Sequence, residues 1–143
     1  MFTDNVTATD LVIGGKVALN LTDPDSSGAV PRTVPGVGEG LMLVGQADKQ
    51  LVFVRHPSAR DQNASVLPVS SEVDNTTFAS SARGTLYVVD NAAGRIIAIT
   101  GNFKQGQAFG SASGLSTIDL KTGQVSARYK VGTDPFGGGV LSR

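Results

Sequence analysis

Apolar and polar residues alternate over short stretches of this chain, and glycine, proline or asparagine separates one stretch from the next. The clearest example is residues 84–101, which read GTLYVVDNAAGRIIAITG. β-Branched and aromatic residues dominate 85–90 and 95–100, and the Asn-Ala-Ala-Gly segment at 91–94 has the chemistry of a tight turn. This pattern predicts a β-hairpin. No segment has sustained helical periodicity, so the sequence predicts an all-β protein.

The same patterns predict the remaining elements. Further strands are expected at 11–13, 17–21, 41–44, 50–56, 65–70, 76–80, 115–120 and 124–131. Pro68 has no N–H to donate to a ladder, so strand 65–70 is expected at a sheet edge. Residues 22–40, with several prolines, and 102–114, where only Phe103 and Phe109 are bulky, are expected to be loops.

Composition narrows the classes of partner. Twelve basic and twelve acidic residues give a net charge of zero, so we expect no nucleic-acid partner. No apolar run approaches the roughly 20 residues needed to cross a bilayer, so we expect no membrane partner. Without cysteine there are no disulfides, thiolate metal sites or cysteine nucleophiles. The start of the chain lacks signal-peptide features, whereas the bias toward Thr, Ser, Asn and Gly suits an exported parent protein; the compartment stays open.

The chain contains a weak internal repeat. Residues 50–55 (QLVFVR) align with residues 85–90 (TLYVVD) at an offset of 85 minus 50, or 35 residues, and a turn and a second apolar strand follow each. Repeats of about 40 residues that contain only short strands are typical of β-propeller blades.

A family resemblance agrees with this reading. Residues 85–91 (TLYVVDN) and 95–100 (RIIAIT) follow a pattern in which an LYVxD strand, a small turn and a strand beginning RI succeed one another. Segment 115–125 (LSTIDLKTGQV) is similar to the next hairpin, and 134–138 (DPFGG) to the entry of the following blade. The chain thus resembles the NHL and SMP-30/gluconolactonase-like six-bladed β-propellers, and most of all exported bacterial propellers of the ScyD type.

Length limits the number of blades. Blades of about 40 residues give a chain of 143 residues only about three, fewer than the roughly four to eight that close a ring. We therefore expect one all-β domain over 1–143 with about three four-stranded antiparallel units at 1–40, 41–75 and 76–143. An open arc would expose apolar faces and sheet edges, so we expect a homo-oligomer or a longer parent chain. A smaller barrel or sandwich is the alternative.

The resemblance also implies a candidate metal site. In the SMP-30-like hydrolases carboxylate and amide oxygens hold a metal, and an Asn about fifteen residues before the Asp of the LYVxD strand belongs to that pattern. Asn75 and Asp90 match this pattern here. We expect no cofactor, and the resemblance implies a divalent cation such as calcium as the alternative. The segment 81–84 (SARG) departs from the family's Ser-Pro-Asp-Gly, and turn formation by Asp90 is the simpler interpretation.

Three other features of the sequence are candidate sites. Residues 23–28 (DPDSSG) match half of a calcium loop, but Val34 stands where the bidentate Glu belongs, so Glu39 or another segment would have to complete it. His56, the only histidine, has no nucleophile-elbow serine to serve and is expected to be a surface or half-buried residue. Residues 36–40 (GVGEG) precede a strand rather than a helix, which excludes a helix-terminus phosphate loop.

The sequence therefore favours a non-enzymatic β-propeller segment that acts as a binding or scaffolding module, with no catalytic residues and with an unknown ligand. A metal-dependent lactonase-like hydrolase that uses Asn75 and Asp90 is the alternative, and a self-contained structural sandwich is a third reading.

Overall fold

In the residues that the structure describes, the regular secondary structure is entirely β, as the sequence predicts. The structure, a computed structural model, describes residues 6–112, 114–129 and 138–142. Within them, no helix has the length and apolarity to cross a bilayer. The strands are β1 (Thr7–Asp10), β2 (Lys16–Ala18), β3 (Pro24–Val30), β4 (Gly40–Gly45), β5 (Gln50–Arg55), β6 (Asn63–Pro68), β7 (Asn75–Phe78), β8 (Arg83–Asp90), β9 (Arg95–Asn102), β10 (Ala108–Ala112), β11 (Gly114–Ile118), β12 (Val125–Tyr129) and β13 (Gly138–Ser142).

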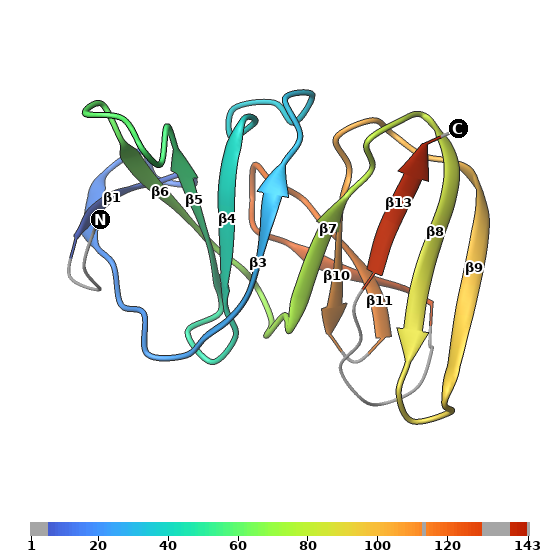
Figure 1. Cartoon of the computed structure of the whole chain (residues 1–143). Coiled ribbons are helices and arrows are strands. Elements are labelled where there is room, and N and C mark those ends of the chain that lie inside the picture. The colour runs from blue at the N-terminus through green and yellow to red at the C-terminus, as the bar shows by residue number, and fades with distance from the viewer. Residues whose placement is uncertain (1–5, 113, 130–137, 143) are drawn as a thin grey trace.

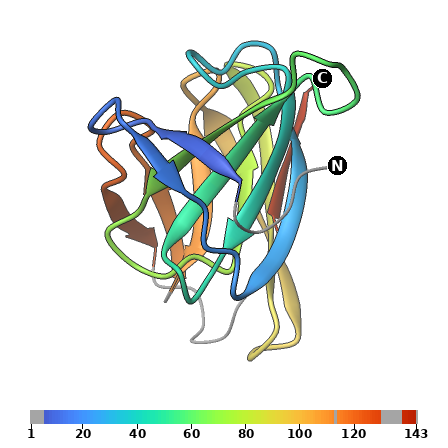
Figure 2. The same cartoon turned by 90° about the vertical axis from the view of Figure 1, so that its left-hand side faces the viewer.

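These strands form three sheets that follow one another across the molecule (Figure 1). The six-stranded sheet has the order β2-β1-β6-β5-β4-β3, the four-stranded sheet β12-β11-β10-β7, and the three-stranded sheet β13-β8-β9. All described pairings are antiparallel except that of β1 with β6. Figure 2 views the molecule from the side of β1 and β2, whose apolar residues pack over the outer face of β4, β5 and β6 in the same sheet.

The sheets do not coincide with the predicted units 1–40, 41–75 and 76–143. The six-stranded sheet includes strands from both of the first two units, and the third unit supplies strands to two sheets. β3 to β6 form an antiparallel meander, which is the arrangement of a propeller blade. β7 pairs with β10 and not with β8, which is the next strand along the chain. The hairpin of β8 and β9 therefore belongs to a separate sheet. The propeller itself stays a prediction.

Apolar side chains fill three layers between and beside the sheets. The largest cluster lies between the six- and four-stranded sheets, a second lies between the four- and three-stranded sheets, and a third covers the outer face of the six-stranded sheet. Representative buried members are Met42, Phe53 and Phe78 in the first, Leu86, Val88 and Phe109 in the second, and Ala8, Val52 and Val66 in the third.

Several predicted elements are confirmed. The hairpin expected from 84–101 is β8 and β9, joined by a turn at 91–94. The strands expected at 41–44 and 50–56 are β4 and β5, and those expected at 115–120 and 124–131 are β11 and β12. Strand β5 ends one residue early because His56 adopts a positive φ of 49° that a strand cannot contain. Residues 130 and 131 of the predicted strand 124–131, and the segment 134–137, lie outside the described residues.

Two predicted loops contain strands. β3 lies within 22–40, and it begins at Pro24, where proline interrupts no ladder bond, with a register shift before Ser27. β10 lies within 102–114 because its small residues fit between β7 and β11: a Cβ on Gly110 would approach Val73 Cγ1 to 2.8 Å. Both strands consist mainly of polar and small residues, so they lack the apolar alternation that predicts a strand. Their extended conformation depends on pairing with neighbouring strands.

Two further assignments were wrong. β6 is not an edge strand, because β1 pairs with it at Ser65 and Val66, while Pro68 lies beyond that pairing at the end of the strand. Residues 11–13 form a turn instead of a strand, since the Asp10 carboxylate accepts the N–H groups of Val12 at 2.8 Å and Ile13 at 3.1 Å. A short polar side chain that bonds backbone two residues ahead is a standard way to end a strand.

Candidate functional site

The first candidate metal ligand, Asp90, ends β8 and is 1% exposed. Its Oδ1 accepts the N–H of Ala93 at 3.1 Å, and its Oδ2 accepts from Arg95 Nε at 3.2 Å. Both carboxylate oxygens therefore close the hairpin turn and pair with the first residue of β9, which matches the turn-forming interpretation.

The second candidate, Asn75, begins β7 in the four-stranded sheet. Its backbone N–H donates to Ser111 Oγ at 3.0 Å, and the residue lines a small cavity between the four- and three-stranded sheets. The cavity has a volume of about 10 Å³, which fits about one water molecule. Thr76 lines it, and the buried Thr76 Oγ1 has no hydrogen-bond partner among the described residues. Asp90 does not line this cavity.

The structure thus places the two candidates on different sheets. In the part of the chain that it describes, no group of three or more His, Cys, Asp or Glu side chains is arranged to hold a metal ion. A metal held by Asn75 and Asp90 stays a prediction. The half-match to a calcium loop at 23–28 was wrong, because 24–28 are extended in β3, Val34 is buried in the core, and Glu39 pairs with Arg32.

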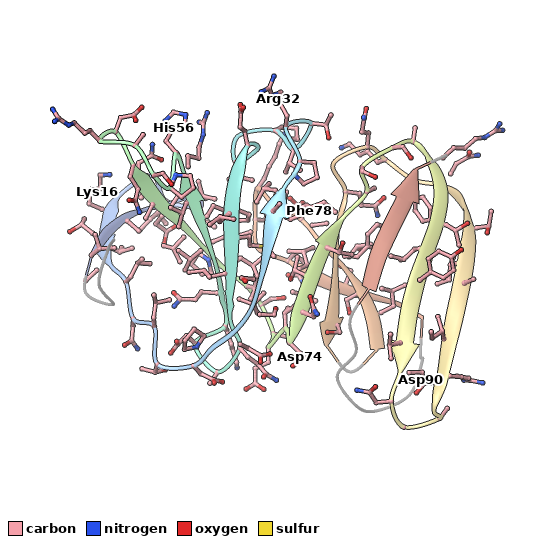
Figure 3. All side chains as sticks on the ribbon, in the orientation of Figure 1. Lys16, Arg32, His56, Asp74, Phe78 and Asp90 are labelled. Carbon is pink, nitrogen blue, oxygen red and sulfur yellow. The ribbon has the colours of Figure 1, made fainter. Side chains whose placement is uncertain are left out.

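A pair of carboxyl groups that sequence reasoning missed lies where β3 meets β7 (Figure 3 labels Asp74 at the lower end of β7). Ser26 Oγ donates to the Asp74 carbonyl at 3.0 Å, and the Asp74 N–H donates to the Ser111 carbonyl at 2.9 Å, which fixes this junction. Burial, a hydrogen bond with the Asp25 side chain and repulsion by its charge raise the pKa of Asp74 to about 6, partly offset by a hydrogen bond from Ser111. Asp25 and Asp74 are 74 minus 25, or 49, residues apart, so no local motif reveals them.

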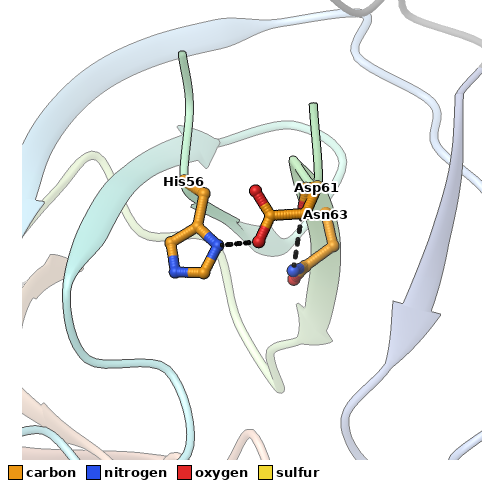
Figure 4. Close-up of polar contacts among 3 residues, drawn as sticks. All are labelled: His56, Asp61 and Asn63. Carbon is orange, nitrogen blue, oxygen red and sulfur yellow. Dashed lines mark hydrogen bonds and ion pairs between the residues drawn. The ribbon is translucent and has the colours of Figure 1, made fainter. Parts of the chain in front are cut away.

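His56 lies on the surface, as expected. Its Nδ1 is 2.8 Å from Asp61 Oδ2, and Asn63 Nδ2 donates to the Asp61 carbonyl at 3.4 Å (Figure 4). Both side chains of the ion pair are exposed, at 44% for His56 and 71% for Asp61. A hydrolytic triad places its histidine between a carboxylate and a nucleophilic hydroxyl, and this arrangement provides the carboxylate alone.

The glycine-containing loop before β4 is an ordered element. Val34 and Val37 are buried in the core, and backbone hydrogen bonds run from Gly38 to Val34 at 2.9 Å and from Glu39 to Val30 at 3.1 Å. With Arg55 at the end of β5, this loop borders an open cavity with a volume of about 310 Å³.

The outward face of the β8–β9 hairpin is apolar and uncovered by the described residues. We call this surface the hairpin face. It consists of the cross-strand pairs Thr85 with Thr100, Tyr87 with Ala98, and Val89 with Ile96. Ile96 is 70% exposed, Tyr87 42% and Val89 38%. The hydroxyl oxygens of Thr85 and Thr100 are 2.9 Å apart at the polar end of the face.

β9 also forms one edge of its sheet, since no described strand pairs with its outer side. It is eight residues long and, after Arg95, contains neither charge nor proline, and its pairing with β8 has no register shift. The other edge strands are shorter or less regular: β2 has three residues and a lysine, β7 has four residues, β12 and β13 have five each, and β3 begins with proline, has a register shift and lies beside β7. Charge, proline and short length are the devices by which sheets prevent unwanted pairing.

Comparison with known protein families, curated proteins and solved structures finds no match to this chain.

Proposed function

We propose that this protein is a non-enzymatic binding or scaffolding module that associates with a second copy of itself through β9. The observation that carries the proposal is the long edge of β9, uncharged from residue 96 to residue 102, next to the exposed apolar residues of the hairpin face. Such an edge offers unpaired backbone N–H and C=O groups, and the face offers apolar area whose burial stabilises a complex.

A second copy fits this edge because β9 is self-complementary. An antiparallel pair related by a two-fold axis at Ala98 places Ile96 opposite Thr100 of the partner and Arg95 opposite its Gly101. No like charges face each other in this register, and the two hairpin faces continue on one side of a joined sheet. Four strands, β8 and β9 of each copy, would then share one apolar surface.

The resemblance to propellers is part of the same proposal. The meander from β3 to β6 has the strand order of one blade, and a chain with about three blades needs more strands to close a ring. Pairing between copies, or with the remainder of a longer parent chain, would provide them.

A matched pair of variants tests the association. Ala98→Lys puts a charge at the centre of the β9 edge, and Ala29→Lys makes the identical change at an exposed position of edge strand β3. We expect light scattering to give the wild-type protein and Ala29→Lys a mass of twice 14.7 kDa or more, and Ala98→Lys a mass near 14.7 kDa. Thermal melts of both variants check that each folds.

A wild-type protein that is monomeric at all concentrations, or equal masses for the two folded variants, would contradict association through β9.

A further inference from the structure

We infer that the cavity between the loop before β4 and the end of β5 binds a small organic molecule through a single carboxylate group. The cavity has a volume of about 310 Å³, within the roughly 300–1,000 Å³ of small-molecule sites. Its lining residues are Arg32, Val34, Pro35, Gly36, Gly38, Glu39 and Arg55. This site is independent of the β9 edge and of the proposed association.

The walls of the cavity are held in place before any ligand arrives. Val34 and Val37 anchor the loop in the core between the sheets. Gly38 permits the loop to turn tightly, because a Cβ there would lie 2.6 Å from the Val34 carbonyl oxygen. Opposite the loop, Arg55 pairs in register with Gly40 at the end of the β4–β5 ladder. A site with fixed walls loses little entropy when a ligand binds.

Arg55 supplies the strongest indication of an anionic ligand. Its Nε is buried and has no hydrogen-bond partner, and no ion pair joins its guanidinium to a described carboxylate. Arg55 lines the cavity without a described counter-ion, so a carboxylate that enters the cavity would neutralise a charge that the described residues leave unpaired. Guanidinium groups bind carboxylates through two parallel hydrogen bonds, which makes a carboxylate the fitting acceptor.

Arg32 and Glu39 set the charge that the cavity accepts. Their side chains form an ion pair and are 82% and 54% exposed, so the pair is weak and Arg32 can exchange Glu39 for a ligand. Two guanidinium groups and one carboxylate leave the cavity one positive charge, which suits a monoanion better than a phosphate dianion. The exposed Pro35 provides an apolar surface for the organic part of the molecule.

Benzoate is the probe for a monocarboxylate, and inorganic phosphate at equal ionic strength is its competitor. We expect benzoate to cause saturable NMR shift changes in the amides of residues 32–34, 36–39 and 55. Arg55→Met keeps the aliphatic stem and removes the charge, and it should weaken benzoate binding by about tenfold or more. Arg60→Met is the matched control, since Arg60 is exposed and does not line the cavity, and it should bind like the wild type.

Two further readouts make the result decisive. Glu39→Gln should tighten benzoate binding, because it removes the carboxylate that competes for Arg32. Arg55→Met should melt at or above the wild-type temperature without ligand, since it deletes an unpaired buried donor. Absence of saturable shifts, or equal binding by Arg55→Met and Arg60→Met, would overturn the inference. Tighter binding of phosphate than of benzoate would overturn the assignment to carboxylates.

Discussion

β5 and β8 carry the two copies of the internal repeat, yet they occupy different environments. Residues 51–54 of β5 are all buried, because β5 packs against the four-stranded sheet on one face and beneath β1 and β2 of its own sheet on the other. In β8 only alternate residues are buried: Leu86 and Val88 point to the core, whereas Tyr87 and Val89 lie on the exposed hairpin face.

One apolar pattern thus occurs in two environments, a strand buried on both faces and a strand with one exposed face. In the six-stranded sheet the chain covers its own second apolar face with an extra pair of strands, and Ala8 and Leu19 belong to that cover. No described segment covers the equivalent face of the three-stranded sheet. An apolar face that the chain leaves open is typical of a surface that a partner covers.

The largest expected effect comes from placing a charge at equivalent positions of the two strands. Val54 is 3% exposed and Val89 is 38% exposed, and the repeat aligns them. Val54→Asp should lower the free energy of unfolding by more than about 4 kcal/mol, because it buries an unpaired carboxylate. Val89→Asp should lower it by about 1 kcal/mol or less and should weaken self-association, since it adds charge to the hairpin face. Urea unfolding followed by circular dichroism measures both.

Similar losses of stability in the two aspartate variants would contradict the difference in burial between Val54 and Val89. They would mean that the hairpin face is covered within a single chain, and they would remove the main support for association through β9.

A smaller effect is expected when the same two valines are shortened. Val54→Ala removes two buried carbons and leaves a space in a packed layer, at a cost of about 2–3 kcal/mol. Val89→Ala should cost less than about 1 kcal/mol in the dissociated protein. The free energy of unfolding of both variants can be measured at several protein concentrations. The loss caused by Val89→Ala should grow as the protein associates, whereas the loss caused by Val54→Ala should not.

The smallest effect concerns acidic groups in the two regions. Asp90 in the hairpin is matched by Arg95, whereas Asp74 beside β3 faces Asp25 and has a pKa raised from 3.8 to about 6. The folded protein therefore binds more protons than the unfolded chain between these values, so stability falls as the pH rises through this range. Asp74→Asn should raise the melting temperature at pH 7.5, and the gain should shrink toward pH 4.5.

Glu72→Gln, which neutralises an exposed acid near Asp74, serves as the control for that experiment and should leave the pH profile unchanged. An Asp74→Asn profile parallel to that of the wild type would show that the carboxyl pair does not contribute to stability.

Local patterns in the sequence were sufficient for the all-β class and for the hairpin of β8 and β9. Alternation and turn residues act over a few neighbours, so they identify an element without its surroundings. They missed β3, whose polar residues at 25–27 suit an edge, and β10, whose small residues are selected by contacts with Val73 and Ile118. Membership of a sheet depends on distant pairing, such as β1 with β6, which no local pattern encodes.

The candidate site illustrates the same limit. The spacing of Asn75 and Asp90 is a count along the chain, and the fold places β7 and β8 in different sheets. Asp25 and Asp74 are brought together only by the junction of β3 and β7, and the unpaired Arg55 Nε depends on what surrounds it at the end of β5. Sequence identifies residue types with suitable chemistry, whereas tertiary packing determines which of them meet.

The pairing of β7 with β10 has a consequence for how this protein can vary. Phe78 lies opposite Ala108, so the chain leaves the four-stranded sheet and returns to it at the same place. Residues 79–107 therefore behave as a cassette inserted between two adjacent strands. Its inner residues must continue to fit Phe109 and Leu115, and β8 must continue to pair with β13, but the outward residues of the hairpin and the length of its turn are free of these constraints. A surface carried in this way can acquire new specificity while the rest of the fold is conserved.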